Sequence, residues 1–243
     1  MPITSGGLAN EGEDRVEDRF DEIMRRLDMQ YGPRPFVPTG DPTRELIASM
    51  LSQSTNDRNS GAALQSLLDT FDSWDEVIDA PVSEVAAAIH AGGLAHQKAP
   101  RIQRALRAVR DLPGPAATLS TMPIDQAMTW LINLDGVGPK TAACILLFAL
   151  GQPVMPVDTH IARVMTRLSI VPDHTSTATK QRILTALVGP HTPTIYAVHV
   201  ETIEHGRIVC RSRRPRCWAC PLQDVCAFYC QNESSIDQEE SNE

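Results

Sequence analysis

A lysine and an aspartate near the middle of the chain are of types that do covalent and acid–base chemistry. Lys140 begins an apolar stretch directly after a Gly-Val-Gly-Pro turn, and Asp158 follows it 18 residues later. The amino end of a helix and partial burial both favour the neutral form of an amine, which attacks a carbonyl and forms a Schiff base. A carboxylate can stabilise a developing sugar cation or move protons. An ordinary surface lysine and a plain helix N-cap are the alternative interpretations.

The glycines in front of this lysine predict a tight turn that another molecule could approach closely. Gly136 and Gly138 flank Val137, so the backbone can turn sharply without a Cβ in the way. Pro139 suits the first position of a helix, and the free N–H groups at a helix amino end can bind a phosphate. The turn is therefore a candidate for contact with nucleic acid, and a plain turn between two helices is the alternative.

The chain has six cysteines, of which five lie within 21 residues near its carboxyl end. Four of them have the spacing C-x6-C-x2-C-x5-C: Cys210, Cys217, Cys220 and Cys226. Because the sequence shows no secretory features, this crowding favours metal binding over disulfides, and four thiolates can surround one soft metal centre. The spacing by itself leaves zinc and an iron–sulfur cluster open. Cys230 falls outside the pattern, and Cys144 is predicted to lie in the core.

Four arginines stand between the first two of these cysteines: Arg211, Arg213, Arg214 and Arg216. A short loop held by a metal centre would present four guanidinium groups to a phosphate backbone. A solvated run of charge is the alternative interpretation.

The net charge of −8 argues at first against nucleic acid as a partner. Residues 1–20 contribute −3 and residues 231–243 contribute −5, so residues 21–230 are neutral, with 20 basic and 20 acidic side chains. A neutral body can still carry a basic face. The two tails are polar and poor in aromatic residues, and they are predicted to be disordered.

Helices are expected to position all of these residues, because apolar residues recur with helical spacing and no segment alternates with period two. Asp41 and Pro42 predict the start of a helix that ends in the polar segment 52–57, and a second helix is expected around residues 64–71. Further helices are predicted over residues 82–90, 99–112, 124–134, 139–150, 159–168, 176–188 and 193–205. The helix over 99–112 is expected to be a basic-faced surface helix, and the last is expected to end at Gly206. The sequence thus predicts an all-α fold.

The string LDGVGPKTA, the later VDTH and the cysteine spacing together resemble the endonuclease III family of helix-hairpin-helix DNA glycosylases. The resemblance covers about residues 35–230. It matches the family's nucleophilic lysine to Lys140 and its aspartate to Asp158, and it implies a [4Fe-4S] cluster on the four cysteines. Gln53 matches the glutamine, and Leu94 the wedge, that fill the gap left by a flipped nucleotide. An exposed leucine and a polar residue at a helix end are the alternatives for these two.

The resemblance also implies an architecture. Two helical domains would flank a DNA-binding cleft: residues 35–152 with the hairpin, and residues 1–34 plus 153–230 with the cluster, followed by the acidic tail 231–243. The sequence departs from the family at Asp135, where proline is usual, and at Ala95, where an aromatic residue often follows the wedge.

The implied function is a bifunctional DNA glycosylase and abasic-site lyase that excises oxidised pyrimidines from duplex DNA. Lys140 and the short chain beyond Cys226 speak against the adenine-glycosylase branch. The alternatives are a monofunctional or weakly active paralogue that mainly binds damaged DNA, and a non-enzymatic DNA-binding protein stapled by a metal. A monomer in the cytoplasm, or at the nucleoid of a bacterium, without a membrane segment is expected.

Overall fold

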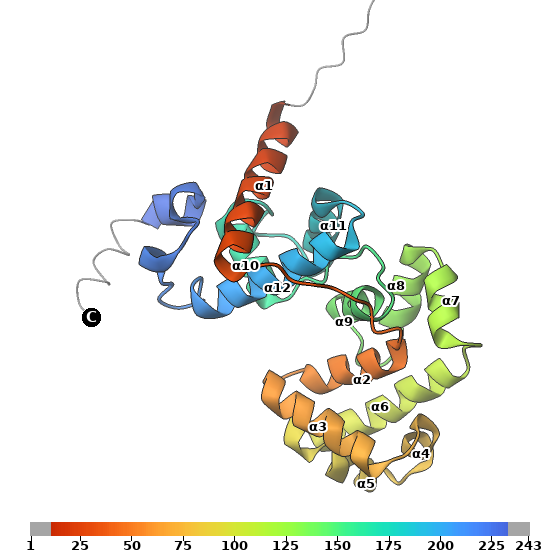
Figure 1. Ribbon diagram of the computed structural model, residues 1–243. Helices are drawn as coiled ribbons and strands as arrows, with labels where there is room; N and C mark the ends of the chain where they lie inside the picture. Colours follow the sequence, from red (N-terminus) through yellow and green to blue (C-terminus); the bar gives the residue numbers. More distant parts are fainter. Residues whose placement is uncertain (1–10, 233–243) are drawn as a thin grey trace, which may run out of the picture. The chain divides into compact units, whose positions relative to one another are not determined.

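The computed structural model describes residues 11–232, and this part of the chain is helical throughout (Figure 1). Its elements are twelve α-helices, three 3-10 turns, one π-helical segment and a further helical turn over 227–232. The predicted all-α fold is therefore confirmed for the described residues. No helix in this part is both long and apolar enough to cross a membrane.

The chain divides into two compact units. The first contains the described residues of 1–35, 157–188 and 197–243, and the second contains residues 36–156 and 189–196. The domain boundaries at residues 34/35 and 152/153 stay a prediction.

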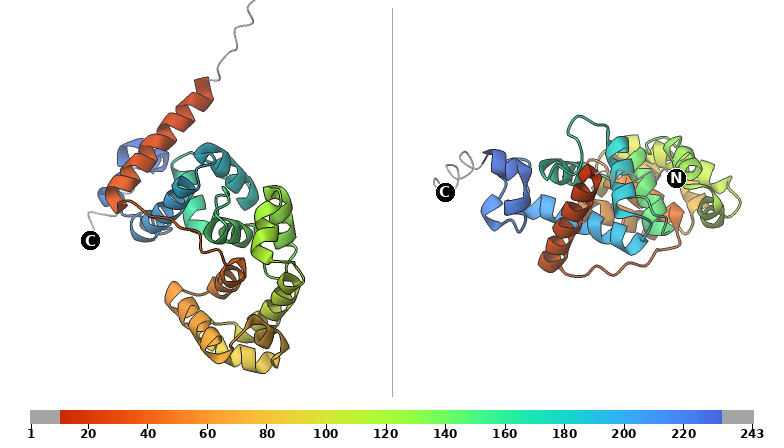
Figure 2. Two further views of the ribbon diagram at one scale, coloured as in Figure 1. Left: turned by 45° about the vertical axis from the view of Figure 1, so that its right-hand side comes forward. Right: turned by 90° about the horizontal axis from the view of Figure 1, so that it is seen from above.

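The second unit holds a single apolar core built by helices from 42 to 149. Its elements are α2 (Pro42–Ser52), α3 (Asp57–Thr70), α4 (Trp74–Asp79), α5 (Val82–Ala88), the 3-10 turn η1 (His90–Gly92), α6 (Ala95–Arg110), α7 (Pro115–Thr121), α8 (Ile124–Ile132), α9 (Pro139–Cys144) and the π-helical segment η2 (Ile145–Ala149). Helix α2 packs against α3, α6 and α9 (Figure 2). This shared core fixes the end of α2, the start of α6 and the turn before α9 relative to one another.

Local signals set most of the helix starts in this unit. The Asp41 side chain accepts a hydrogen bond from the Arg44 N–H at 2.9 Å, and Pro42 takes the first helical turn of α2, as predicted. Asn56 caps α3 in the same way by accepting from the Asn59 N–H at 2.9 Å. The helices α4 and α7 were not predicted, because six and seven residues are too few to show a helical period.

Helix α6 differs from the prediction at its start and in its surroundings. It begins at Ala95 rather than at residue 99. Ala99, Ile102 and Leu106 are buried, so the helix crosses the core of the unit rather than lying on its surface. The expected basic face is present as exposed arginines on the other side: Arg101, Arg104, Arg107 and Arg110.

The first unit contains the remaining elements. They are α1 (Glu11–Tyr31), α10 (Thr159–Arg167), α11 (Thr177–Val188), the greater part of α12 (Thr192–Ile208), the 3-10 turns η3 (Cys217–Ala219) and η4 (Gln223–Val225), and a helical turn over 227–232.

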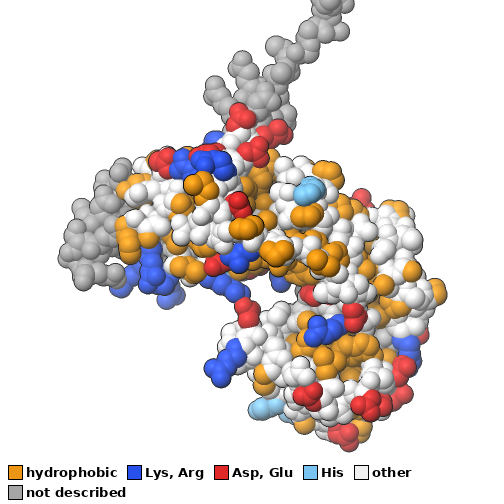
Figure 3. Space-filling model, viewed as in Figure 1, with side chains coloured by type: hydrophobic (Ala, Val, Ile, Leu, Met, Phe, Trp, Pro, Cys, Tyr) orange, Lys and Arg blue, Asp and Glu red, His pale blue; other side chains and the backbone are white. Residues whose placement is uncertain are grey.

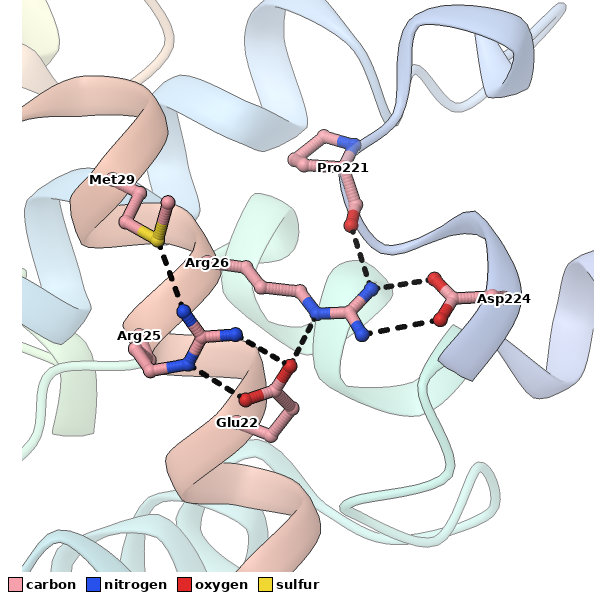
Figure 4. Close-up of polar contacts among 6 residues, drawn as sticks. All are labelled: Glu22, Arg25, Arg26, Met29, Pro221 and Asp224. Carbon is pink, nitrogen blue, oxygen red and sulfur yellow. Dashed lines mark hydrogen bonds and ion pairs between the residues drawn. The ribbon is translucent and has the colours of Figure 1, made fainter.

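Helix α1 corrects the predicted disorder of residues 1–20, because it begins at Glu11. Phe20, Ile23 and Leu27 form its buried stripe, and the acidic composition before Phe20 hides this stripe from a reading of composition. Arg26 of α1 holds the segment around η4: its guanidinium pairs with both oxygens of Asp224 at 2.5 and 3.1 Å and donates to the Pro221 carbonyl at 3.1 Å (Figure 4). Residues 1–10 and 233–243 of the predicted tails lie outside the described residues, whereas Gln231 and Asn232 are helical.

Helix α12 does not end at Gly206 but continues to Ile208. A Cβ at Gly206 would lie 2.9 Å from the His160 Cβ and 3.2 Å from its Nδ1. The glycine is therefore needed for the close packing of α12 on α10 and does not terminate the helix.

Candidate functional site

The predicted hairpin is present between α8 and α9. Gly136 has a φ of +83°, and the Val137 N–H donates to the Leu134 carbonyl at 3.0 Å, which closes the turn. A Cβ added at Gly138 would meet no atom within 4 Å, so its backbone faces open space. The Val137 side chain, in contrast, is only 6% exposed and belongs to the core. Any contact that Val137 makes with DNA must therefore go through its backbone.

Lys140 is the second residue of α9 and is half-buried. A carboxyl group from α2, Glu45, lies within electrostatic range of it. Burial raises the pKa of Glu45 to about 7, while the Ser49 hydroxyl and the charge of Lys140 act in the opposite direction. The sequence analysis missed Glu45, because an acid in the first turn of a helix has an ordinary role beside the helix dipole.

Asp158 caps α10, and its Oδ1 accepts from the Ile161 N–H at 2.8 Å. The alternative interpretation as an N-cap thus describes a contact that the structure contains, and it fixes the direction of the carboxylate. Asp158 belongs to the first unit and Lys140 to the second. Their action on one substrate stays a prediction.

Two other predicted residues come together in the second unit. Gln53 is the C-cap residue of α2, and its Nε2 donates to the Gly136 carbonyl at 2.8 Å. The hairpin is also tied to α6, because Asp135 accepts from the Arg104 Nε at 3.1 Å and lies 3.8 Å from the Arg101 Nε. The Arg104 guanidinium holds the pKa of the Asp135 carboxyl below its usual value. The predicted departure at Asp135 thus corresponds to an ion pair between the hairpin and α6.

Leu94 is the residue in front of α6 and has an exposed side chain, at 51%. Its φ of 51° and ψ of 30° are left-handed, a conformation that costs a non-glycine residue on the order of 1 kcal/mol. Gly93 before it has a φ of 69° and a ψ of 160°, which only glycine adopts readily. An apolar side chain is therefore held in solvent by a strained residue, and its action as a wedge stays a prediction.

The four patterned cysteines line one cavity in the first unit, whose wall also includes Val164, Leu168, Leu222, Phe228 and His205. Burial, together with smaller contributions from the neighbouring Cys210, Cys226 and Cys217, raises the pKa of the Cys220 thiol to about 12. Grouped thiols in an apolar cavity are costly as thiolates unless a metal centre compensates their charge, so the donor set fits such a centre. Within residues 11–232, no group of three or more His, Cys, Asp or Glu side chains has the arrangement needed to hold a single metal ion. Cys144 is buried, as predicted, and Cys230 is exposed.

Two arginines of α10 that the sequence analysis missed fix the loop after α12. Arg163 donates to the Cys210 carbonyl at 3.0 Å and to the Gly206 carbonyl at 2.8 Å. Arg167 donates to the Cys210 Sγ at 3.2 Å and to the Arg211 carbonyl at 2.7 Å, and it lies over the Phe228 ring. Their spacing of four residues on a helix with basic character was the available signal.

The predicted arginine loop is presented to solvent on this support. All four of its arginines are exposed: Arg211, Arg213, Arg214 and Arg216. Basic side chains gather on the surface of the unit over the segment that follows α12 (Figure 3). Arg163 and Arg167 thus hold the backbone of an exposed basic loop, and the contact of this loop with a phosphate backbone stays a prediction.

Comparison with known proteins agrees with this arrangement. Residues 47–188 match the HhH-GPD superfamily of base excision DNA repair proteins. The chain is 31% identical over 218 residues to endonuclease III of Thermotoga maritima, which covers 88% of this chain and 93% of the relative. It is 30% identical over 211 residues to endonuclease III of Escherichia coli K12, with coverage of 85% and 94%.

Two solved structures show the same fold. A non-covalent endonuclease III–DNA complex matches with a TM-score of 0.74 and 25% identity over 90% of this chain and 98% of the other. A trapped endonuclease III–DNA covalent intermediate matches with a TM-score of 0.73 and 25% identity, with coverage of 89% and 98%. Fold and matched region define the class as an HhH-GPD DNA glycosylase of base excision repair. Within this class, the chain belongs to the endonuclease III family, and the predicted resemblance is confirmed.

Proposed function

We propose that the protein is a bifunctional DNA glycosylase and abasic-site lyase that acts on oxidised or ring-saturated pyrimidines in duplex DNA. The observation that carries this proposal is the position of Lys140: a half-buried amine in the first turn of the helix that directly follows the hairpin. The backbone at Gly138, open to solvent, can bind the phosphate beside a flipped nucleotide.

In the proposed reaction, the neutral amine of Lys140 bonds to C1′ of the flipped nucleotide as the bond between C1′ and the base breaks. The base leaves with the electron pair and takes up a proton, and the sugar ring opens to a Schiff base. A proton is then lost from C2′, and the C3′–O3′ bond breaks so that the phosphate leaves with its electron pair, which nicks the strand. Water then hydrolyses the Schiff base and releases the amine of Lys140. Asp158, fixed by its capping bond, stabilises positive charge on the sugar and assists the proton transfers.

Gln53 and Leu94 supply the groups that replace the extruded nucleotide in the stack. The exposed, strained Leu94 supports a wedge role, and the position of Gln53 beside the hairpin supports insertion at the same site. A single copy of the chain suffices for this arrangement.

The cavity cysteines would hold a [4Fe-4S] cluster through Cys210, Cys217, Cys220 and Cys226. When bound, such a cluster would crosslink the segments before and after η3. Arg163 and Arg167 orient the loop between the first two cysteines, and the loop's arginines bind the phosphate backbone.

Borohydride trapping on abasic-site and thymine-glycol duplexes tests the proposal, because it reduces a Schiff base to a stable crosslink. We expect wild type to crosslink and nick, and Lys140→Gln to do neither while it still binds DNA. Excision without crosslinking would indicate a monofunctional glycosylase. Binding without excision would indicate a non-enzymatic DNA-binding protein, and undiminished crosslinking by Lys140→Gln would exclude this residue as the nucleophile.

A further inference from the structure

Lys98 is a buried lysine that the proposed chemistry does not use. It lies in the first turns of α6, four residues after the wedge Leu94, and it is 5% exposed. Burial lowers the pKa of its amine. An ammonium group near the amino end of a helix is unfavourable to both the helix dipole and its own solvation, so its contacts must compensate.

Both compensating contacts are backbone carbonyls at the ends of other elements. The Lys98 Nζ donates to the Leu51 carbonyl at 2.7 Å and to the Gly92 carbonyl at 2.9 Å. Leu51 belongs to the last turn of α2, whose carbonyls have no partner within the helix and form the negative end of its dipole. The lysine therefore caps the end of α2 and joins it to the turn that begins the wedge loop.

Each of the two acceptor residues lies two positions before one of the residues proposed to insert into DNA. Leu51 lies two residues before Gln53, and Gly92 lies two residues before Leu94. The chain segments also lie close together here, since a Cβ at Gly92 would be 3.8 Å from the Leu51 carbonyl oxygen. One ammonium group thus fixes the separation of the backbone segments that carry both side chains.

The wedge loop needs such support because its conformation is strained. Gly93 adopts its positive φ readily, but Leu94 also has a positive φ, which a leucine disfavours, so the intrinsic preference of Leu94 does not hold the loop in place. The Leu94 carbonyl also accepts from the Lys98 N–H at 2.9 Å, which ties the same residue to the start of α6. Loss of the Nζ contacts would leave two buried carbonyls without this donor and allow the loop to relax.

We propose that Lys98 is a positioning residue that holds Gln53 and Leu94 in register for simultaneous insertion into DNA. It touches neither DNA nor the reacting atoms. The inference deepens the proposed function and rests on it, because it concerns the extrusion of a stacked base. Removal of the Lys98 donor should impair the opening of paired DNA more than the chemistry on a nucleotide that has no base.

Lys98→Met tests this proposal, because methionine keeps the length and apolar stem but cannot donate. Gln103→Met is the matched control. Gln103 is on the same helix, is 2% exposed, and its Nε2 donates to the Val77 and Ala80 carbonyls at 2.8 Å, away from the wedge loop. Lys98→Met loses two bonds to backbone carbonyls, and Gln103→Met loses its two short bonds and a longer one to the Ile78 carbonyl at 3.4 Å, so their thermal unfolding should change similarly.

Single-turnover excision from a thymine-glycol duplex and nicking of an abasic-site duplex are then compared. We expect Lys98→Met to lose about 10- to 100-fold on the paired lesion and far less on the abasic site, which has no base to unstack. Gln103→Met should keep the wild-type ratio of the two rates. Equal losses on both substrates by Lys98→Met, or the same pattern in Gln103→Met, would overturn the positioning role. If Lys98→Met does not fold, Lys98→Leu, which also lacks a donor, is read by the same ratio.

A base-stacking probe separates this inference from the proposed function. Fluorescence of 2-aminopurine next to the lesion rises when the stack opens and requires no catalysis. If wild type binds but neither excises nor crosslinks, the proposed function fails. A probe signal that is present in wild type and Gln103→Met but weak in Lys98→Met still supports the positioning role, and equal signals contradict it.

Discussion

Single residues in this protein carry both the proposed chemistry and part of the pH response of its stability. Glu201 on α12 is 1% exposed, and burial, followed by the charge of Asp28, raises its pKa to about 7. Between pH 4.5 and about 7 the folded state therefore keeps a proton that the unfolded chain, with its ordinary pKa of 4.5, has released. The resulting stabilisation is complete below the unfolded pKa and is lost as the pH rises through 7.

Glu201→Gln removes this titration. We expect the variant to be more stable than wild type by about 2 kcal/mol well above neutral pH, and the difference to vanish near the ordinary glutamate pKa of 4.5. Urea unfolding across this pH range measures the free energies. A difference that does not change with pH would show that folding leaves the pKa of Glu201 unchanged.

At the scale of elements, the loop between Cys210 and Cys217 is the clearest candidate for phosphate contact. Each arginine that releases counterions from DNA adds about 0.9 to the slope of log affinity against log salt. Arg213→Ala should lower this slope by about that amount, measured by fluorescence anisotropy at several salt concentrations. Arg182→Ala, an exposed arginine on α11, controls for net charge. Equal slopes for the two variants would place the loop away from DNA.

The elements also show what sequence patterns can predict. Caps and turns are encoded locally, so the starts of α2 and α9 and the hairpin followed from residue types. Helix α1, the continuation of α12 through Gly206 and the π-helical segment η2 depend on packing partners distant in sequence, which a local period does not contain.

Some residues of the candidate site could likewise be predicted from the sequence, whereas others could be found only from the fold. Lys140, Asp158 and the cysteines have side chains whose chemistry is visible from type and spacing. Lys98 and Arg167 are ordinary basic residues in the sequence, and they acquire roles only because the fold brings backbone carbonyls to them.

At the scale of the whole molecule, the proposed cluster can be tested with the cysteines themselves. Cys226→Ser should lose its absorbance at about 400 nm, where iron–sulfur clusters absorb. It should also lose its bound iron and sulfide. Cys230→Ser is the matched control, because Cys230 is exposed and falls outside the spacing. Iron that is retained in Cys226→Ser, or lost equally in both variants, would contradict the assignment of the four ligands.

The side-chain hydrogen bonds around the candidate site have one feature in common, and this feature determines which positions tolerate substitution. In each of these hydrogen bonds a side chain donates to a main-chain oxygen. The pairs are Lys98 with Leu51 and Gly92, Gln53 with Gly136, Gln103 with Val77 and Ala80, and Arg163 with Gly206 and Cys210. Every residue type has such an oxygen, so a donor constrains the path of the chain at its acceptor but not the side chain there. Leu51 and Val77 can therefore exchange for other apolar residues without loss of these bonds, whereas each donor has no equivalent replacement. In each of these hydrogen bonds, substitution of the donor residue should therefore be poorly tolerated, whereas substitution of the acceptor residue should be well tolerated.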